Sequence, residues 1–321
     1  MHIDSGHADA LAQRIVQAHA HLLAGEGCRE AQARREGDAA LAVRLAPEHA
    51  LAALAVLRAS RQLGFVEEDA HCLARAWVAQ TQRTGAFDTS HWPDAPQDFG
   101  LPAHPRASAF APCPHDLGLY AVLPDAAWVA RMAQAGVPTV QLRFKSDDTD
   151  AIAREVHAAV RAVQGTPARL FINDHWRIAI DAGAYGVHLG QEDMAEAPLA
   201  RIREAGLRLG LSTHGYAEMI RADAVNPSYL ALGAVFPTTL KRMKTAPQGL
   251  GRLSAYARLM RQHPLVAIGG IDPARIGDVM RSGVGSIAVV RAITAETEPE
   301  RAAQTLQDLM RAGREAAENR L

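Results

Sequence analysis

The sequence predicts an α/β fold, a (β/α)8 TIM barrel that follows an all-helical N-terminal extension. From residue 117 to residue 293, eight short apolar runs recur, and nearly every interval holds an amphipathic stretch or a helix-ending glycine. Near-continuous apolar runs are typical of parallel strands that helices cover on both faces. Eight such units in succession is the number that closes a barrel. A doubly wound open sheet is the competing architecture, and the eight regular units favour closure.

The extension comprises residues 1–86, which are rich in alanine and leucine. Apolar residues recur there every three or four positions, which predicts helices over 8–25, 46–63 and 66–84. Gly64 stands where the second helix should stop, and Glu67 to Asp69 place negative charge in the first turn of the third. Residues 87–116 hold six of the chain's 17 prolines, so we expect a linker without regular structure.

The barrel is predicted over residues 117–321. Its eight expected strands are 117–124, 139–145, 169–174, 186–191, 208–214, 229–236, 265–271 and 286–293. The loop after the sixth strand, FPTTLKRMKTAPQGLG, contains Lys241 and Lys244, two of the three lysines in a chain with 34 basic residues. Lysine is a compact and flexible point charge, so this placement favours a cation that reaches a bound phosphate.

Composition limits the classes of partner. The chain has 321 residues, of which 48% are hydrophobic and 21% charged, as in ordinary globular proteins. A formal net charge of −1 gives no electrostatic case for nucleic acid or an anionic membrane. No apolar run approaches the ~18 residues of a membrane span. The N-terminus has no secretory pattern, and the three cysteines lie far apart, so we expect a reduced, cytoplasmic environment.

Polar side chains follow several strands at the end where such barrels place their active sites. Along the second strand Gln141, Arg143 and Lys145 share one face, because side chains alternate. Two cations and an amide on one face favour an anion site, although a buried ion pair or a solvated rim would give the same pattern.

Two carboxylates follow the third and fourth strands. Adjacent strands lie ~4.8 Å apart, so Asp174 and Asp193 could share one hard cation. Magnesium suits such a pair, because it binds one or two carboxylates and completes its coordination with water and phosphate oxygens. Helix capping is the alternative role for both residues.

The remaining strand ends carry weaker signals. Ser212 and His214 end the fifth strand, but no third group is indicated that would make a nucleophilic triad. Gly269 and Gly270 end the seventh strand opposite the backbone of Val290 and Arg291, a place where such barrels commonly bind phosphate. A tight turn would also explain the glycines.

Six segments, taken together, resemble the thiamine-phosphate synthase (thiamine-phosphate pyrophosphorylase) family in order and spacing. They are VQLRFK, FINDHWRIAI, GVHLGQEDM, LGLSTHG, ALGAVFPTTLKRMKTAPQGL and VAIGGIDPARIGDVMRSGVGSIAVVRAI, and the resemblance covers roughly residues 117 to 313, all eight units. The resemblance implies a transferase that joins 4-amino-2-methyl-5-(diphosphooxymethyl)pyrimidine to a thiazole phosphate. It also implies release of pyrophosphate and a need for Mg²⁺.

The resemblance implies three sets of site residues by position. The pyrimidine diphosphate would be contacted by Gln141, Arg143, Lys145, Asn173, Ser212 and Lys241. Magnesium would be held by Asp174 and Asp193, and the thiazole phosphate by Thr238, Gly270 and the backbone of Val290 and Arg291. Lys241, Arg143 and Lys145 are the expected catalytic residues, because they neutralise charge on the departing pyrophosphate. The mechanism that the resemblance implies needs no side-chain nucleophile, since the thiazole nitrogen itself would attack the pyrimidine methylene in a displacement of dissociative character.

Three positions depart from the family pattern. Phe144 stands where an acid is frequent, Leu240 where a second threonine is usual, and Arg291 where serine is usual. These departures concern mainly the thiazole side. A thiazole tautomerase-like barrel and a non-catalytic phosphate-ligand sensor are the alternative functions. Retention of Asp174, Asp193 and Lys241 argues for the synthase.

The extension has a separate and fainter resemblance. Residues 52–80 resemble the last helices of hydroxymethylpyrimidine kinase, but the glycine-rich phosphate loop of that kinase is absent. We therefore expect a degenerate remnant, or an element for packing and homo-oligomerisation, and no kinase activity.

Overall fold

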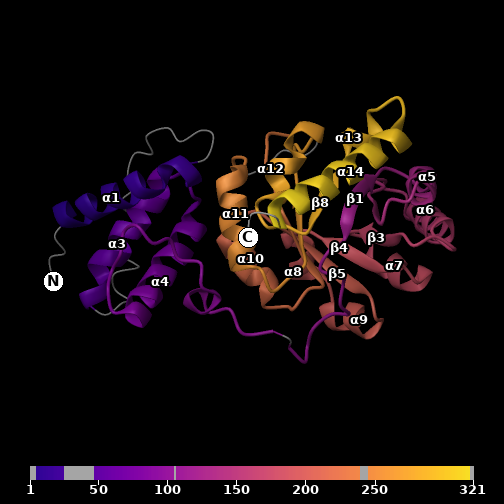
Figure 1. The fold of residues 1–321 in the computed structure, drawn as a ribbon. Helices are drawn as coiled ribbons and strands as arrows, with labels where there is room; N and C mark the ends of the chain where they lie inside the picture. Colours follow the sequence, from indigo (N-terminus) through magenta and orange to yellow (C-terminus); the bar gives the residue numbers. More distant parts are fainter. Residues whose placement is uncertain (1–4, 25–46, 105, 239–244, 319–321) are drawn as a thin grey trace.

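The computed structural model describes residues 5–24, 47–104, 106–238 and 245–318. Within these ranges the chain forms a helical extension that packs against one side of a barrel (Figure 1). Lys241, Lys244 and Leu240 lie outside the described residues.

The eight predicted strands are confirmed, and they form a closed parallel barrel in sequence order. The strands are β1 (Gly118–Leu123), β2 (Thr139–Leu142), β3 (Arg169–Asn173), β4 (Gly186–Leu189), β5 (Arg208–Thr213), β6 (Tyr229–Leu232), β7 (Leu265–Ile268) and β8 (Ser286–Val289). Closure is made by β1 and β8, where Gly118 pairs with Ser286. The prediction of a closed barrel over an open sheet is therefore confirmed.

Helices surround the barrel between its strands. They are α5 (Ala126–Gln134), α6 (Thr149–Ala162), α7 (Trp176–Ala182), α8 (Gln191–Glu196), α9 (Leu199–Glu204), α10 (Tyr216–Asp223), α11 (Gly249–Leu259), η3 (Pro273–Arg275), α12 (Ile276–Met280), α13 (Arg291–Thr294) and α14 (Pro299–Glu318). Asp125 and Asp148 cap α5 and α6 with their side chains. None of the described helices combines the length and the apolar character that crossing a bilayer requires.

The strands are shorter at their carboxyl ends than the apolar runs suggested. β2 ends at Leu142, and Arg143 and Lys145 follow it outside the ladder. The packed interior of the barrel cannot hydrate a cation, so charged side chains leave the ladder where the barrel opens. The same shortening at β6 places Phe236 in the loop that follows it.

Aromatic side chains fill the middle of the barrel. Tyr120, Phe171 and Tyr229 are fully buried and contact one another, with ring centroids 5.1–5.9 Å apart. Gly210 makes room for this layer, since a Cβ there would lie 2.1 Å from the Tyr229 ring. The barrel is thus closed beneath its mouth by packed rings.

The extension consists of α1 (Ser5–Leu23), α3 (Pro47–Gln62) and α4 (Glu67–Thr84). Gly64 follows α3 with a φ of 83°, a left-handed conformation that suits glycine at a helix end. Buried residues of the extension, such as Leu57 and Trp77, belong to the same hydrophobic cluster as the outer face of the barrel. The extension and the barrel therefore share one core.

The segment predicted as a linker, residues 87–116, has little regular structure but is packed. Its one described helix is the short η2 (Pro96–Phe99). Trp92 stacks on Phe65 of the extension and donates its indole N–H to the hydroxyl of Tyr216 on α10 at 2.9 Å. Phe99 is buried against Tyr216 on the barrel. These side chains fill the junction between the two parts.

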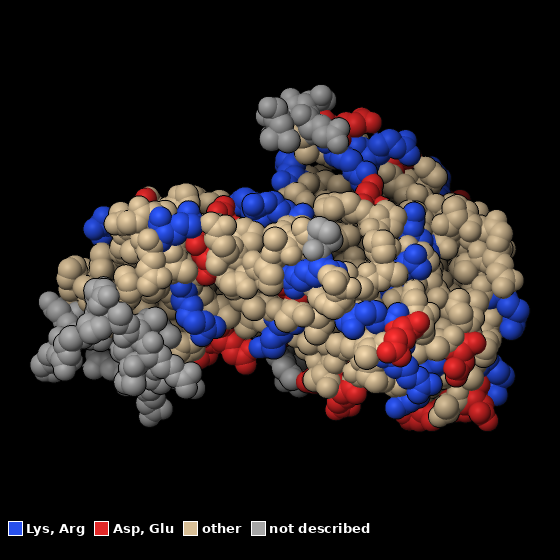
Figure 2. All heavy atoms as spheres, turned by 90° about the horizontal axis from the view of Figure 1, so that it is seen from below, with Lys and Arg blue, Asp and Glu red and all other residues tan. Residues whose placement is uncertain are grey.

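Charged groups are interspersed on the surface. On the face shown in Figure 2, Lys and Arg lie among Asp and Glu over both the extension and the barrel. This distribution agrees with the near-zero net charge.

A polar cluster joins the segment of residues 87–116 to the amino-terminal end of the barrel. His104 and His263 both lie within hydrogen-bond distance of one Asp223 oxygen, at 3.1 and 2.7 Å. Arg106 donates to the other oxygen at 2.5 Å. The two histidines and Asp223 are the one group of three potential metal ligands among the described residues. Because Arg106 occupies this group with its own positive charge, we interpret it as a structural network.

We expect Asp223→Asn to lower the free energy of unfolding by about 3 kcal/mol, because it leaves Arg106 without its buried counter-ion. Burial would raise the pKa of Asp223, but hydrogen bonds from His263, Arg106 and His104 outweigh it and lower this pKa to about 2. The unfolded chain then binds the proton more tightly, so this stabilisation is full above about pH 4 and is lost as pH falls towards 2. Urea unfolding at neutral and acid pH measures it.

The control is Asp278→Asn, which breaks an exposed pair with Arg281 and should cost less than about 1 kcal/mol. An Asp223 variant as stable as this control would contradict the interpretation.

Candidate active site

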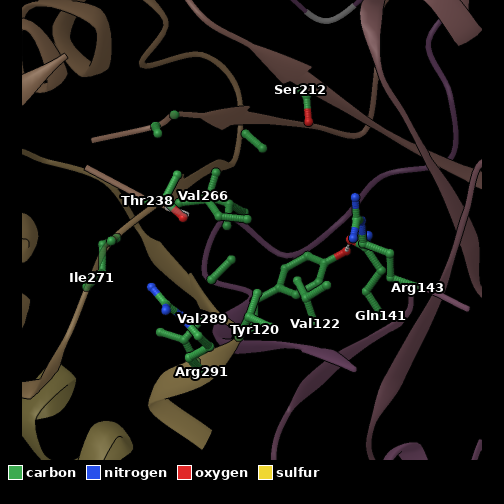
Figure 3. A pocket seen from close by; sticks show the side chains of 18 of the residues that line it. Tyr120, Val122, Gln141, Arg143, Ser212, Thr238, Val266, Ile271, Val289 and Arg291 are labelled. Atoms are coloured by element: carbon green, nitrogen blue, oxygen red, sulfur yellow. Dashed lines mark hydrogen bonds between the residues drawn. The ribbon is translucent and has the colours of Figure 1, made fainter. Parts of the chain in front are cut away.

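A cavity of about 870 Å³ opens at the carboxyl ends of the strands. It is lined by all the site residues predicted from the sequence except Lys241, which lies outside the described residues: Gln141, Arg143, Lys145, Asn173, Asp174, Asp193, Ser212, Thr238, Gly270, Val290 and Arg291. Figure 3 shows Gln141 and Arg143 on one side of it, and Thr238 and Arg291 across from them.

The end of β2 forms a cationic wall. Gln141, Arg143 and Lys145 line the cavity, whereas Leu142 is buried in the outer core and Phe144 packs against that core. The alternation that the sequence indicated therefore directs both cations into the mouth. Within the described part of the chain neither cation forms an ion pair. This wall can therefore accept an anionic ligand.

The two carboxylates lie at the neighbouring strand ends. Burial raises the pKa of Asp174, and the charge of Asp193 raises it further. Asp174 has a φ of 62°, an uncommon conformation for a residue other than glycine, and such outliers cluster at functional sites. A cation between the carboxylates would offset the cost of burying the Asp174 charge and its repulsion by Asp193.

The capping alternative applies to one of the two. Asp193 accepts a hydrogen bond from the backbone N–H of Gly190 at 3.2 Å and so caps α8. Asp174 does not cap α7, whose N-cap position is His175. Its side chain instead accepts from Asn173 Nδ2 at 2.5 Å. Among the described residues, one oxygen of each carboxylate is thus engaged, and a second oxygen on each remains for a ligand.

A hydrogen-bonded chain crosses the floor of the cavity from Asp174 to Ser212. It runs through Asn173, Gln141, Tyr120, Tyr229 and His188, with donor–acceptor distances of 2.5–2.9 Å. An ionised Asp174 can only accept, so Asn173 donates to it and accepts from Gln141. Gln141 in turn accepts from the hydroxyl of Tyr120.

The direction of the remaining bonds follows. Tyr120 has donated its proton to Gln141, so it accepts from Tyr229, and Tyr229 accepts from Nδ1–H of His188. Burial raises the pKa of both tyrosines, which keeps their hydroxyls protonated. His188 lies within hydrogen-bond distance of the hydroxyl of Ser212 through Nε2, at 2.8 Å. The chain therefore requires a proton on Nδ1 of His188, which donates to Tyr229.

This arrangement does not activate Ser212 as a nucleophile. The orienting partner of His188 is a neutral tyrosine, and a tyrosine hydroxyl cannot stabilise an imidazolium as a carboxylate does. In the described structure the hydroxyl of Ser212 contacts His188, whereas His214 pairs through Nδ1 with Glu218 at 2.6 Å. Ser212 is therefore a hydrogen-bonding group at the cavity wall.

The opposite wall is built from backbone. Gly270 has a φ of 64°, and a Cβ there would lie 2.5 Å from the carbonyl oxygen of Pro237. Only glycine fits both constraints. Across from it α13 begins at Arg291, so its first N–H groups lack intrahelical partners. Arg275 lines the same side and donates to the carbonyl of Gly270 at 2.5 Å. This wall suits a small anion such as a monophosphate.

Sequence reasoning missed Tyr120, His188, Tyr229 and Arg275. The first three lie inside apolar runs, where a single polar residue gives only a weak signal of its function. Arg275 is one of many arginines in a helical stretch. The available signal was a tyrosine or a histidine at an inward-facing position in each of β1, β4 and β6.

A TIM barrel whose mouth gathers carboxylates, cations and glycine backbone is an enzyme scaffold for phosphorylated small molecules. Comparison with known proteins gives the particular family. The family model described as thiamine monophosphate synthase matches residues 119–293. The chain therefore belongs to the thiamine monophosphate synthase family, and it is an enzyme, a transferase.

Relatives agree with this family. The chain is 55% identical to thiamine-phosphate synthase of Neisseria meningitidis serogroup A over 200 residues, which cover 62% of this chain and 98% of the relative. It is 53% identical to that of Cronobacter sakazakii over 207 residues, covering 64% and 98%. A solved thiamine phosphate pyrophosphorylase from Pyrococcus furiosus superposes with a TM-score of 0.54 at 26% identity, covering 61% of this chain and 96% of the other. More than a third of this chain lies outside each match.

Proposed function

We propose that the cavity joins 4-amino-2-methyl-5-(diphosphooxymethyl)pyrimidine to a thiazole phosphate and releases pyrophosphate. One observation carries this proposal beyond family membership. The same cavity has two separate walls suited to anions, one of cations and carboxylates on β2 to β4, the other of backbone N–H groups on β7 and β8. A reaction between a diphosphate and a monophosphate needs both.

The diphosphate belongs at the wall formed by Arg143, Lys145, Asp174 and Asp193, and the monophosphate at Gly270 and the start of α13. Asn173, Gln141 and Ser212 line the same cavity and belong to the hydrogen-bonded chain on its floor. Amide and hydroxyl groups held in a hydrogen-bonded chain are suited to orient the aminopyrimidine ring. The sequence assigns Lys241 to the diphosphate as well, and that assignment stays a prediction.

The carboxylate pair fits Mg²⁺. Asp174 and Asp193 each keep one oxygen for a ligand, and burial together with the charge of Asp193 raises the pKa of Asp174, so its ionised form is costly without a cation. Mg²⁺ typically binds one or two carboxylates together with substrate phosphates and water. When bound there, it would neutralise charge on the leaving pyrophosphate.

The side chains of this chain bind and orient rather than exchange protons. Arg143 and Lys145 offset the negative charge that develops on the departing diphosphate. The backbone wall holds the thiazole phosphate so that the ring nitrogen faces the pyrimidine methylene. The aromatic floor beneath the cavity limits access of water from below, which protects a methylene cation from hydrolysis.

The test is an assay of pyrophosphate release from the purified chain. We expect release only when both phosphorylated heterocycles and Mg²⁺ are present, with thiamine phosphate as the joined product. EDTA should abolish the activity, and added Mg²⁺ should restore it. Binding of either compound without pyrophosphate release would favour the sensor alternative instead.

A further inference from the structure

The helical extension contacts the barrel at the two helices that follow β5 and β6. α4 packs on α10, and α1 packs on α11 (Figure 1). Ser212 near the end of β5 and Thr238 in the loop after β6 both line the cavity. The family model starts at residue 119, so the extension lies outside what it matches. The contact is therefore a feature of this chain placed directly behind part of the active site.

Asp69 of α4 makes the contact with α10. Its Oδ1 accepts the backbone N–H of Ala217 at 2.9 Å, so a residue of the extension caps a helix of the barrel. Its carboxylate also lies against Gly215, where a Cβ would come within 2.1 Å of Oδ2. Gly215 is three residues after Ser212. The carboxylate thus fixes the turn that leads from Ser212 into α10.

Arg252 of α11 makes the reciprocal contact. It is buried and donates to the carbonyl oxygens of Leu23 at 3.0 Å and Leu63 at 2.7 Å, which end α1 and follow α3. Its guanidinium lies 3.9 Å from the centre of the Phe65 ring. The barrel therefore caps helices of the extension while the extension caps a helix of the barrel, and the two hold one relative position.

The carboxylate of Asp69 is costly where it lies. Asp69 is 4% exposed. Burial raises its pKa to about 6, and Glu218 and Glu68 add to this, while the N–H of Ala217 and the charge of Arg252 oppose it. An apolar side chain could join two packed helices without this cost. What the carboxylate supplies instead is an acceptor aimed at the first turn of α10.

We propose that Asp69 is a positioning residue of the active site, through which the helical extension holds the turn after β5 and thereby Ser212 at the pyrimidine side of the cavity. This inference rests on the proposed function. It assigns the extension a role in the reaction beyond packing. It predicts that loss of Asp69 impairs use of the pyrimidine diphosphate more than binding of the thiazole phosphate, because the thiazole phosphate binds on β7 and β8, away from this turn.

The experiment compares three variants of the full chain by steady-state kinetics, varying each substrate in turn, with circular dichroism to check folding. Asp69→Ala removes the acceptor. Asp69→Asn keeps an acceptor oxygen in nearly the same shape. Glu68→Ala is the matched control, since Glu68 also joins α4 to α10 but through an exposed pair with Arg221 at 3.0 Å.

For Asp69→Ala we expect kcat/KM for the pyrimidine diphosphate to fall about tenfold or more, as for a displaced substrate-positioning group. KM for the thiazole phosphate should stay within about twofold of wild type. Asp69→Asn should restore most of the loss, and Glu68→Ala should match wild type. A folded Asp69→Ala protein with wild-type kinetics, or with both substrates equally affected, overturns the inference.

Gly215→Ala gives a second approach from the barrel side, and it decides the matter if Asp69→Ala does not fold. The backbone at Gly215 is extended, with a φ of 174°, which alanine can adopt, and the three atoms nearest to an added Cβ all belong to the Asp69 carboxylate. Selective loss with the pyrimidine substrate supports the inference, and wild-type kinetics overturns it. An inactive wild-type chain would instead contradict the proposed function, so the two failures are distinguishable.

Discussion

Asp174→Asn is expected to lower turnover by about 10²–10³-fold, the range seen when one group that stabilises transition-state charge is removed. Asparagine has the shape of aspartate and tolerates the left-handed backbone at this position, so the fold should be kept. The amide cannot replace a charged ligand for Mg²⁺. The Mg²⁺ concentration that gives half-maximal activity should therefore rise as turnover falls.

The stability of the Asp174→Asn variant should not fall with its turnover. Burial and Asp193 both raise the pKa of Asp174, so its ionised form costs folding free energy near neutral pH. Asparagine removes that cost, and the thermal midpoint without Mg²⁺ should be equal to or above that of wild type. Asp181→Asn on the outside of α7 is the matched control, with no change in either property. Normal turnover with an unchanged Mg²⁺ requirement in the Asp174 variant would exclude this residue from the site.

Arg143→Ala is the second large effect that we expect. The guanidinium enters the cavity from the end of β2 and forms no ion pair within the described part of the chain. It is therefore available for the diphosphate, which it can bind with two parallel hydrogen bonds. Removing it should lower kcat/KM for the pyrimidine diphosphate by about 10²-fold or more, with a smaller effect on KM for the thiazole phosphate.

Two further variants separate charge from geometry. Arg143→Lys keeps the charge but loses the planar fork, and it should recover only part of the activity. Arg301→Ala removes an arginine that is exposed on α14 and should leave the kinetics unchanged. Equal losses with both substrates in Arg143→Ala would show that the residue supports the whole cavity and not the diphosphate wall.

The architecture could be predicted from local patterns because each unit repeats the same pattern. Eight apolar runs gave the strand number, and alternation along β2 directed Arg143 and Lys145 to the mouth while Leu142 and Phe144 took the outer side. The patterns that predicted the three helices of the extension were equally local. They include the acidic first turn of α4 and Gly64 after α3. The exact strand ends were less predictable, since each strand stops where its charged side chains reach solvent at the mouth of the barrel.

The polar floor could not be predicted in this way. Tyr120, His188 and Tyr229 are far apart in the chain and meet only because the barrel closes. A single hydroxyl or imidazole in an apolar run is compatible with a buried packing role. Its partners, and hence its tautomer and its direction of donation, exist only in three dimensions.

The sequence by itself determined the barrel, the polar residues at its mouth and the helical character of the extension, because these depend on residue type and spacing along the chain. The tertiary structure alone decided which side chains meet. It joined Asp174 to Ser212 through a hydrogen-bonded floor, and it brought Asp69 to a helix of the barrel 148 residues away. Hydrogen bonds of this kind depend on ångström-scale positions that closure and packing set, and no local pattern encodes them.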